Sequence, residues 1–201
     1  DENGKPTHIT NETLEVTRIV KKLSDKKNSG AELTAEEAAL LQRTTAELEA
    51  ERQGATETLA ANQKALVDLE APFAVIRTFV EGDLKELTVD KVKAIDAKDE
   101  AVMLAKEQIL KIYESVNAKH TARILLIIER YEAALNYSLN LEFNPRAEIV
   151  KDNPEDIADT NYGNNEVNGP EADHGTHVAG IIAALRNNNL GANGIAENVR
   201  I

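Results

Sequence analysis

A seven-residue apolar repeat spans residues 35–80 and limits the folds open to this chain more than any other feature. Such a repeat keeps its apolar positions on one side of a helix, so it predicts one long helix with a partner packed along its length. Thr34 and Glu37 match a capping box at its start. Pro72 is expected to kink or divide the helix, because its ring clashes with the carbonyl one turn earlier. One set of repeat positions comprises Leu41, Leu48, Ala55, Asn62, Leu69 and Ile76, and a second set comprises Leu59, Leu66, Phe73 and Val80.

Similar apolar stripes predict further helices over about 11–27, 89–96, 99–116 and 121–139. Thr88 is placed to cap the second of these. The stripe of the third comprises Val102, Ala105, Ile109, Ile112 and Val116. We expect the two long arms, 35–80 and 99–140, to run antiparallel and to bury their stripes against each other. The fold class predicted for residues 1–143 is therefore mainly α, a long helical hairpin or bundle resembling a coiled coil.

Composition changes near residue 144, which predicts two domains, 1–143 and 144–201. The second contains 6 of the 10 glycines and 3 of the 5 prolines, and the Asn-Pro pair at its start breaks the preceding helix. We expect a short strand at Ile149-Val150, a polar loop, a helix ending near Leu185, and the opening of another strand at 199–201. This order predicts part of an α/β domain, and we expect the natural chain to continue beyond it.

The overall composition disfavours several partners and chemistries. A net charge of −12 disfavours nucleic acid, whose binding depends on clustered Lys and Arg. No stretch approaches the roughly 18 apolar residues of a membrane span, and the start of the chain has no pattern typical of a signal peptide. The absence of cysteine excludes disulfides, thiolate catalysis and cysteine-ligated zinc.

His174 lies at the start of the predicted apolar helix and is the first candidate for chemistry. The positive end of a helix dipole favours a neutral imidazole, the form that a general base requires. His177, one helical turn further on, would share nearly the same helix face. From the residues alone, one alternative is a capping histidine followed by a core histidine. Another is a metal-binding pair, for which no third ligand is specified nearby.

The run His174-Gly175-Thr176-His177-Val178-Ala179-Gly180 resembles the histidine motif of the subtilisin-like serine proteases. The similarity continues, with one extra residue in the turn at 186–189, through Ala183-Ala184-Leu185, Asn188, Leu190-Gly191 and Gly194-Ile195-Ala196. Residues 141–172 are also similar to a branch of large bacterial subtilases. In that branch a helical insertion separates the aspartate motif from the histidine motif.

This resemblance implies a catalytic triad in the chain order Asp, His, Ser. His174 would take the proton from the serine hydroxyl and later give it to the leaving amine, and His177 would be a buried structural residue. Gly175 and Gly180 would let the helix pack closely against a sheet. The implied substrates are proteins or peptides, and the implied location is the periplasm or the outside of a bacterial cell.

The other two members of the triad are missing from the sequence. Asp159-Thr160-Asn161 lacks the glycine and the preceding strand of the family's aspartate motif, and Asp173 is too close to His174 to orient it. No serine motif is present, and we expect solvated helical positions for Ser24, Ser29, Ser115 and Ser138. The sequence therefore predicts His174 as the one catalytic residue of a fragment that is inactive alone, with the Asp and Ser motifs outside it.

The turn after the predicted helix matches a loop that binds calcium in some subtilases, through an asparagine side chain and backbone carbonyls. The corresponding positions here are Asn188, Leu190 and Ala192, and the alternative is a simple polar turn. The acidic stretch from Asp152 to Asp159 does not have the spacing of an EF-hand and is expected to be a solvated loop.

A non-catalytic role is the alternative function. Helices rich in Lys and Glu with one apolar seam are typical of a packed hairpin, and such arms can mediate interaction or form a homo-oligomer. The sequence further predicts that a helix over 174–185 lacks the sheet against which it normally packs. Its exposed apolar face would then comprise Val178, Ile181, Ile182 and Leu185.

Overall fold

The computed structural model describes residues 11–153, 155–163, 165 and 172–200. They belong to two compact units, one ending at Pro145 and the other beginning at Arg146. We call them the helical unit, residues 11–145, and the carboxyl-terminal unit, residues 146–200, and describe each by itself. The described residues are mainly α and contain no β-strand, apart from an isolated bridge between Thr88 and His120.

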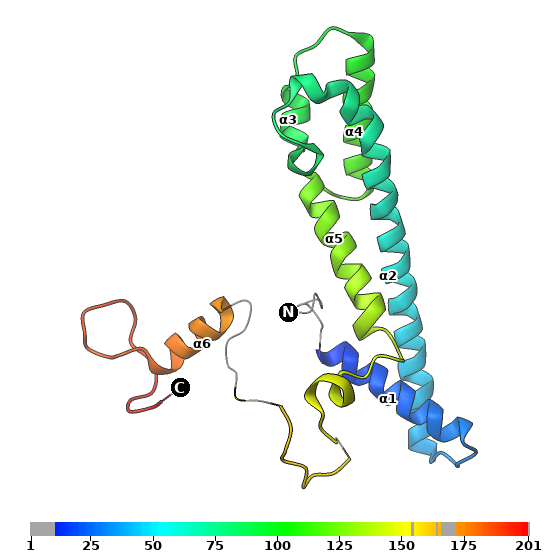
Figure 1. The fold of residues 1–201 in the computed structure, drawn as a ribbon, viewed down its shortest axis with the longest axis vertical. Coiled ribbons are helices and arrows are strands. Elements are labelled where there is room, and N and C mark those ends of the chain that lie inside the picture. Colours follow the sequence, from blue (N-terminus) through cyan, green and yellow to red (C-terminus); the bar gives the residue numbers. More distant parts are fainter. Residues whose placement is uncertain (1–10, 154, 164, 166–171, 201) are drawn as a thin grey trace. The chain divides into compact units, whose positions relative to one another are not determined.

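Two helices, α1 and α2, form the first part of the helical unit (Figure 1). α1 spans Asn11–Asn28, and the chain turns at Gly30, whose φ of 82° is a conformation that glycine adopts without strain. α2 spans Ala35–Ile76 and is the longest element. Both helices lie where the apolar stripes predict them.

The two ends of α2 follow from local sequence. The predicted capping box is present: the Glu37 N–H donates to Thr34 Oγ1 at 3.1 Å, and the Thr34 N–H donates to the Glu37 carboxylate at 2.9 Å. Pro72 does not divide α2, which continues for one more turn to Ile76 before a 3-10 turn over Arg77–Phe79.

The return arm consists of shorter helices joined end to end. They are a 3-10 turn (Leu84–Glu86), α3 (Val89–Ala94), α4 (Glu100–Ser115), α5 (Thr121–Ala133) and a π-helix (Ala134–Ser138). α3 begins at the predicted cap, where Thr88 Oγ1 accepts the Lys91 N–H. α4 and α5 run back along α2 in the opposite direction, as Figure 1 shows. The predicted antiparallel packing of two long arms is therefore confirmed.

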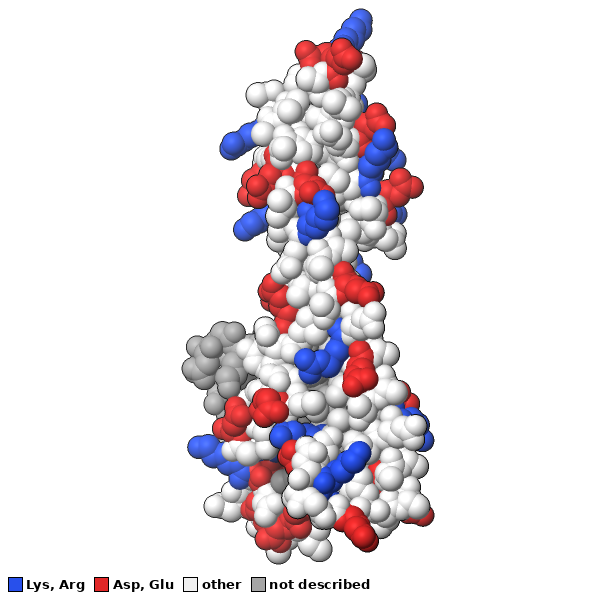
Figure 2. Space-filling model, turned by 90° about the vertical axis from the view of Figure 1, so that its right-hand side faces the viewer, with Lys and Arg blue, Asp and Glu red and all other residues white. Residues whose placement is uncertain are grey.

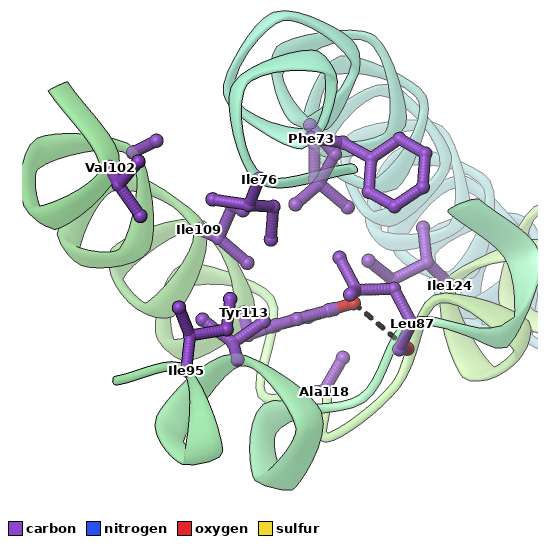
Figure 3. Close-up of a cluster of buried hydrophobic side chains, with 13 residues drawn as sticks. Phe73, Ile76, Leu87, Ile95, Val102, Ile109, Tyr113, Ala118 and Ile124 are labelled. Carbon is purple, nitrogen blue, oxygen red and sulfur yellow. Dashed lines mark hydrogen bonds between the residues drawn. The ribbon is translucent and has the colours of Figure 1, made fainter. Parts of the chain in front are cut away.

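The principal core lies between α2, α4, α5 and the segment that joins α2 to α4 (Figure 3). The predicted stripe of α4 is buried at Val102, Ala105 and Ile109. Ile112 and Val116 are only half-buried, because Tyr113 points into the core in their place. The fully buried side chains of this core include Leu69, Ile76, Leu87, Val92, Ile109, Tyr113 and Ile124.

A second, smaller core joins α1 to the middle of α2 and to the π-helix. It is built from Val20, Leu48, Ala55 and Leu139. The Thr17 hydroxyl donates to the Ser138 carbonyl at 2.7 Å within this contact. Ser138 is buried, so the expectation that it is solvated is wrong; α1 covers this face of the π-helix, which the local sequence does not reveal.

The apolar repeat of α2 is only partly matched by burial. The first set of positions is buried from Leu48 to Ile76, whereas Leu41 is half-buried. In the second set only Phe73 is buried, and Ala65 and Pro72, one residue away from the expected positions, are buried instead. The reason is that α2 packs first against α1 and then against α4 and α5, rather than against one continuous partner.

The surface of the helical unit carries charges of both signs. Figure 2 shows Lys and Arg interspersed with Asp and Glu over the drawn face, without a broad basic area on that face. Several are paired one helical turn apart, as in Lys64–Asp68 and Lys111–Glu107. None of the helices in the described part of the chain is long and apolar enough to cross a membrane.

The carboxyl-terminal unit differs from the sequence-based expectation. Ile149 and Val150 lie in a π-helix, Arg146–Val150, so the predicted short strand is wrong. Val199 and Arg200 are not in a strand either, and Ile201 lies outside the described residues. β-branched residues favour strands only where another strand accepts their hydrogen bonds, and the described residues of this unit offer none. Among the described residues, the predicted α/β segment therefore consists of this π-helix, one α-helix, α6 (Asp173–Ala183), and loops.

Candidate functional site

The candidate site is the first turn of α6, where His174 follows the first helical residue. Ala172 precedes the helix and supplies no side-chain cap, but its carbonyl accepts the Thr176 N–H at 2.9 Å. Asp173 places a carboxylate at the positive end of the helix dipole, which stabilises this end. The helix therefore begins where the sequence predicts, with the imidazole in its first turn.

His174 and His177 share one face of α6, and both are exposed. The structure does not bear out a buried His177, because no described residue of this unit packs over that face. The predicted apolar face is exposed as well: Val178 is 42% exposed, Ile181 61%, Ile182 43% and Leu185 74%. The imidazole of His174 thus lies at the amino-terminal end of the exposed apolar face of α6.

The carboxyl end of α6 is capped by the segment that follows it. A helix leaves the carbonyls of its last turn without intrahelical partners. Here the Ile195 N–H donates to the Ile181 carbonyl at 3.0 Å, and the Ala196 N–H donates to the Ile182 carbonyl at 2.9 Å. The chain returns to the helix through a loop, 186–197, and so satisfies these carbonyls internally.

The return of this loop depends on Gly194, which is buried. Its N–H donates to the Ala184 carbonyl at 2.9 Å, and a Cβ at this position would lie 2.5 Å from Ala184 N. Gly175 and Gly180, which the resemblance implies as close-packing positions, have no atom within 4 Å of such a Cβ. Within this unit the close approach is therefore made by Gly194.

Arg186 and Glu197 complete the loop. Arg186 Nη1 donates to the Gly194 carbonyl at 2.8 Å and to the Ile195 carbonyl at 3.3 Å. Arg186 Nε lies 3.1 Å from the Glu197 carboxylate. This arginine was not predicted from the sequence; the signal for it is a basic residue just past a helix end, with a glutamate in the returning segment.

Within the described residues of the carboxyl-terminal unit, no catalytic triad forms around His174. Residues 146–201 contain no serine, and Ser24, Ser29, Ser115 and Ser138 all belong to the helical unit. The Asp159 carboxylate accepts the N–H groups of Asn153 and Asn161 within its own loop. No hydrogen bond or ion pair joins His174 to a carboxylate in the described part of the chain.

The positions matched to a calcium loop, Asn188, Leu190 and Ala192, lie in the turn that follows α6. Asn188 Oδ1 accepts the Leu190 N–H at 3.0 Å, so this oxygen is turned back onto its own loop. No group of three or more acidic, histidine or cysteine side chains suited to a metal ion is found among the described residues. Calcium prefers several oxygen ligands, usually with carboxylates among them.

Comparison with known proteins decides the family. The model of the subtilase family matches residues 24–201, which include α2 to α5 as well as α6. The chain belongs to the subtilase family. None of the curated proteins and none of the solved structures matches this subtilase chain. The resemblance carried by the histidine motif is therefore confirmed at the level of the family, and the matched range extends far into the helical unit.

Proposed function

We propose that this chain is part of a subtilisin-like serine endopeptidase in which His174 is the general base. The observation that carries the proposal is the position of His174: it is the first histidine of the family's motif, exposed in the first turn of α6, within the matched range. In this role the imidazole accepts the proton of the serine hydroxyl as it attacks the peptide carbonyl. It then gives that proton to the leaving amine.

The remaining catalytic groups come from segments that this sequence does not contain. The orienting aspartate and the nucleophilic serine are supplied there, and the 201-residue chain by itself is inactive. The exposed stripe of Val178, Ile181 and Ile182 is the face on which the rest of the catalytic domain packs. The substrates are proteins or peptides, and the enzyme acts outside the bacterial cytoplasm.

We assign the two parts of the chain different roles. Residues 1–143 are a helical insertion domain, and residues 144–201 are part of the catalytic domain. The insertion has two cores of its own, so it folds without contributing to the chemistry. An arm of this kind is suited to gate substrate, to dock a partner or to pair with a second copy.

Kinetics of the full-length protein test the role of His174. His174→Ala should lower kcat/KM by roughly a thousandfold or more, since both proton transfers are lost. Lys64→Gln, at an exposed position of α2 outside the histidine motif, is the control and should retain most of the activity. Unchanged activity in the first variant, or an equal loss in both, would contradict the proposal.

A non-catalytic interaction module is the second candidate, and the closed cores of the helical unit favour it. Under this alternative, the arms carry the function and the histidine segment is a remnant of an inactive relative. Two measurements separate the two candidates: analytical ultracentrifugation of the 201-residue chain, which detects an oligomer, and a peptidase assay of the full-length protein. An oligomer that forms through the arms, in a full-length protein without peptidase activity, would establish the second role.

A further inference from the structure

The carboxyl end of α6 requires a fixed loop, because its last carbonyls are paired by that loop and not by a following helix turn. The donors are the N–H groups of Gly194, Ile195 and Ala196. These three consecutive groups reach the helix only if the chain from Arg186 to Glu197 closes on itself. A group that closes this loop therefore fixes the carboxyl end of α6, the helix whose first turn contains His174.

The Arg186 guanidinium is placed to close it. It binds two consecutive carbonyls, those of Gly194 and Ile195, on the opposite side of the same peptide units that donate to α6. It also pairs with Glu197, just beyond them. Hydrogen bonds from a charged donor are stronger than those between neutral groups, and the planar guanidinium can satisfy several acceptors at once.

The rest of the loop has no comparable charged hydrogen bond or ion pair. Asn187 N–H donates to Asn193 Oδ1 at 3.0 Å, and Leu190 N–H donates to Asn188 Oδ1 at 3.0 Å. Both bonds are exposed, and Leu190 is 73% exposed. The loop tip thus depends on the bonds at its base, where Arg186 lies.

A calcium ion is a poor alternative for this place. Asn188 Oδ1, the side-chain oxygen that would bind the ion, already accepts a backbone N–H, which occupies one of its two lone pairs. The base of the same loop already holds one positive charge, and like charges at short range repel. The acidic partner in the loop, Glu197, is engaged by Arg186.

We propose that the Arg186 guanidinium is the cation that closes the 186–197 loop against the carboxyl end of α6. Arg186 is thereby a positioning residue for α6, and its link to catalysis, though not its structural role, rests on the proposed function of His174. Neither Asn188 nor Leu190 ligates a metal in this arrangement.

Residue-resolved amide hydrogen exchange on the 201-residue chain tests this proposal. In Arg186→Gln the N–H groups of Ile195 and Ala196 should exchange about tenfold faster, since charge-assisted bonds at the loop base are lost. Arg186→Lys should recover part of the protection, and added methylguanidinium should restore it in Arg186→Ala. Chelation by EDTA should leave the wild-type pattern unchanged. The Glu37 N–H, in the capping box of the helical unit, is the internal control and should not change.

Two results would overturn the proposal: unchanged exchange of Ile195 and Ala196 in Arg186→Gln, or faster exchange in the wild type on chelation. Turnover of the full-length protein separates this proposal from the assignment of His174. Arg186→Ala should lower kcat more than it raises KM, and methylguanidinium should restore kcat, whereas it should not rescue His174→Ala. If the exchange results hold but His174→Ala is fully active, the loop assignment stands and the proposed function fails.

Discussion

The phenolic oxygen of Tyr113 lies 2.8 Å from the hydroxyl oxygen of Thr121, in the interior of the helical unit. The same phenol is 3.0 Å from the Leu87 carbonyl, to which it donates (Figure 3). These contacts connect α4, the start of α5 and the segment after α2. One buried polar group therefore fixes three parts of the arm relative to one another.

Tyr113→Phe should lower the free energy of unfolding by about 1–2 kcal/mol, because two buried hydrogen bonds are lost while the ring remains. Urea denaturation followed by circular dichroism measures the change. Tyr162→Phe is the control, since Tyr162 is 53% exposed, and should have almost no effect. An equal stability of the two variants would show that the buried phenol does not contribute.

The same residue predicts a loss of stability in alkali. Burial raises the pKa of Tyr113 above its ordinary value of 10.0, although the bond to Thr121 acts in the opposite direction. The folded protein therefore holds this proton when the unfolded chain has released it. The contribution of the protonated Tyr113 phenol to the free energy of unfolding is fully present below pH 10.0. It falls as the pH rises from there towards the folded-state pKa.

Tyr113→Phe cannot lose stability in this way. The difference in unfolding free energy between wild type and variant should therefore shrink above pH 10.0, when both are unfolded by urea at a series of pH values. A difference that stays constant across this range would contradict the raised pKa.

Asn62 is a buried polar residue at a repeat position of α2. Its Nδ2 donates to the Thr58 carbonyl, while its Oδ1 is buried without a partner among the described residues. Asn62→Leu should therefore raise the free energy of unfolding by about 1 kcal/mol, because an unpaired buried oxygen is removed. Leu69→Ala, at the next repeat position, should lower it by about 2–5 kcal/mol and controls for the method. Destabilisation by Asn62→Leu would show that the amide has a partner in solution.

Gly194 and Gly180 give opposite expectations for the same substitution. Gly194→Ala would place a Cβ 2.5 Å from Ala184 N, so the loop should detach and the Ile195 N–H should exchange faster. Gly180→Ala meets no atom within 4 Å and should stabilise the helix by about 1 kcal/mol through higher helix propensity. Hydrogen exchange of the 201-residue chain measures both. Equal exchange in the two variants would contradict the placement of the loop.

Most of the helical unit follows from local sequence. The capping box at Thr34, the cap at Thr88 and the stripe through Ile109 depend on residues within a few turns of one another, which the periodicity of a helix reveals. The burial of Ser138 and the orientation of Tyr113 depend on which distant helix covers them. The repeat of α2 does not contain that information.

In the candidate site, too, some features follow from local sequence and others depend on contacts that the local sequence does not reveal. The histidine motif places His174 at the start of α6, and its local pattern predicted the exposed face at Val178. The strand expected at Ile149-Val150 was wrong, because strand formation needs a partner that a local pattern cannot supply. Arg186 was missed because its acceptors are backbone carbonyls, whose positions no side-chain pattern encodes.

Covalent labelling with a serine-directed phosphonate tests the central claim, that His174 is the base of a serine protease, most directly. The full-length protein should be labelled at one serine, and His174→Ala should be labelled slower by roughly a thousandfold, because the serine is no longer activated. The 201-residue chain should not react. Labelling of His174→Ala at the wild-type rate, or labelling of the 201-residue chain, would contradict the account.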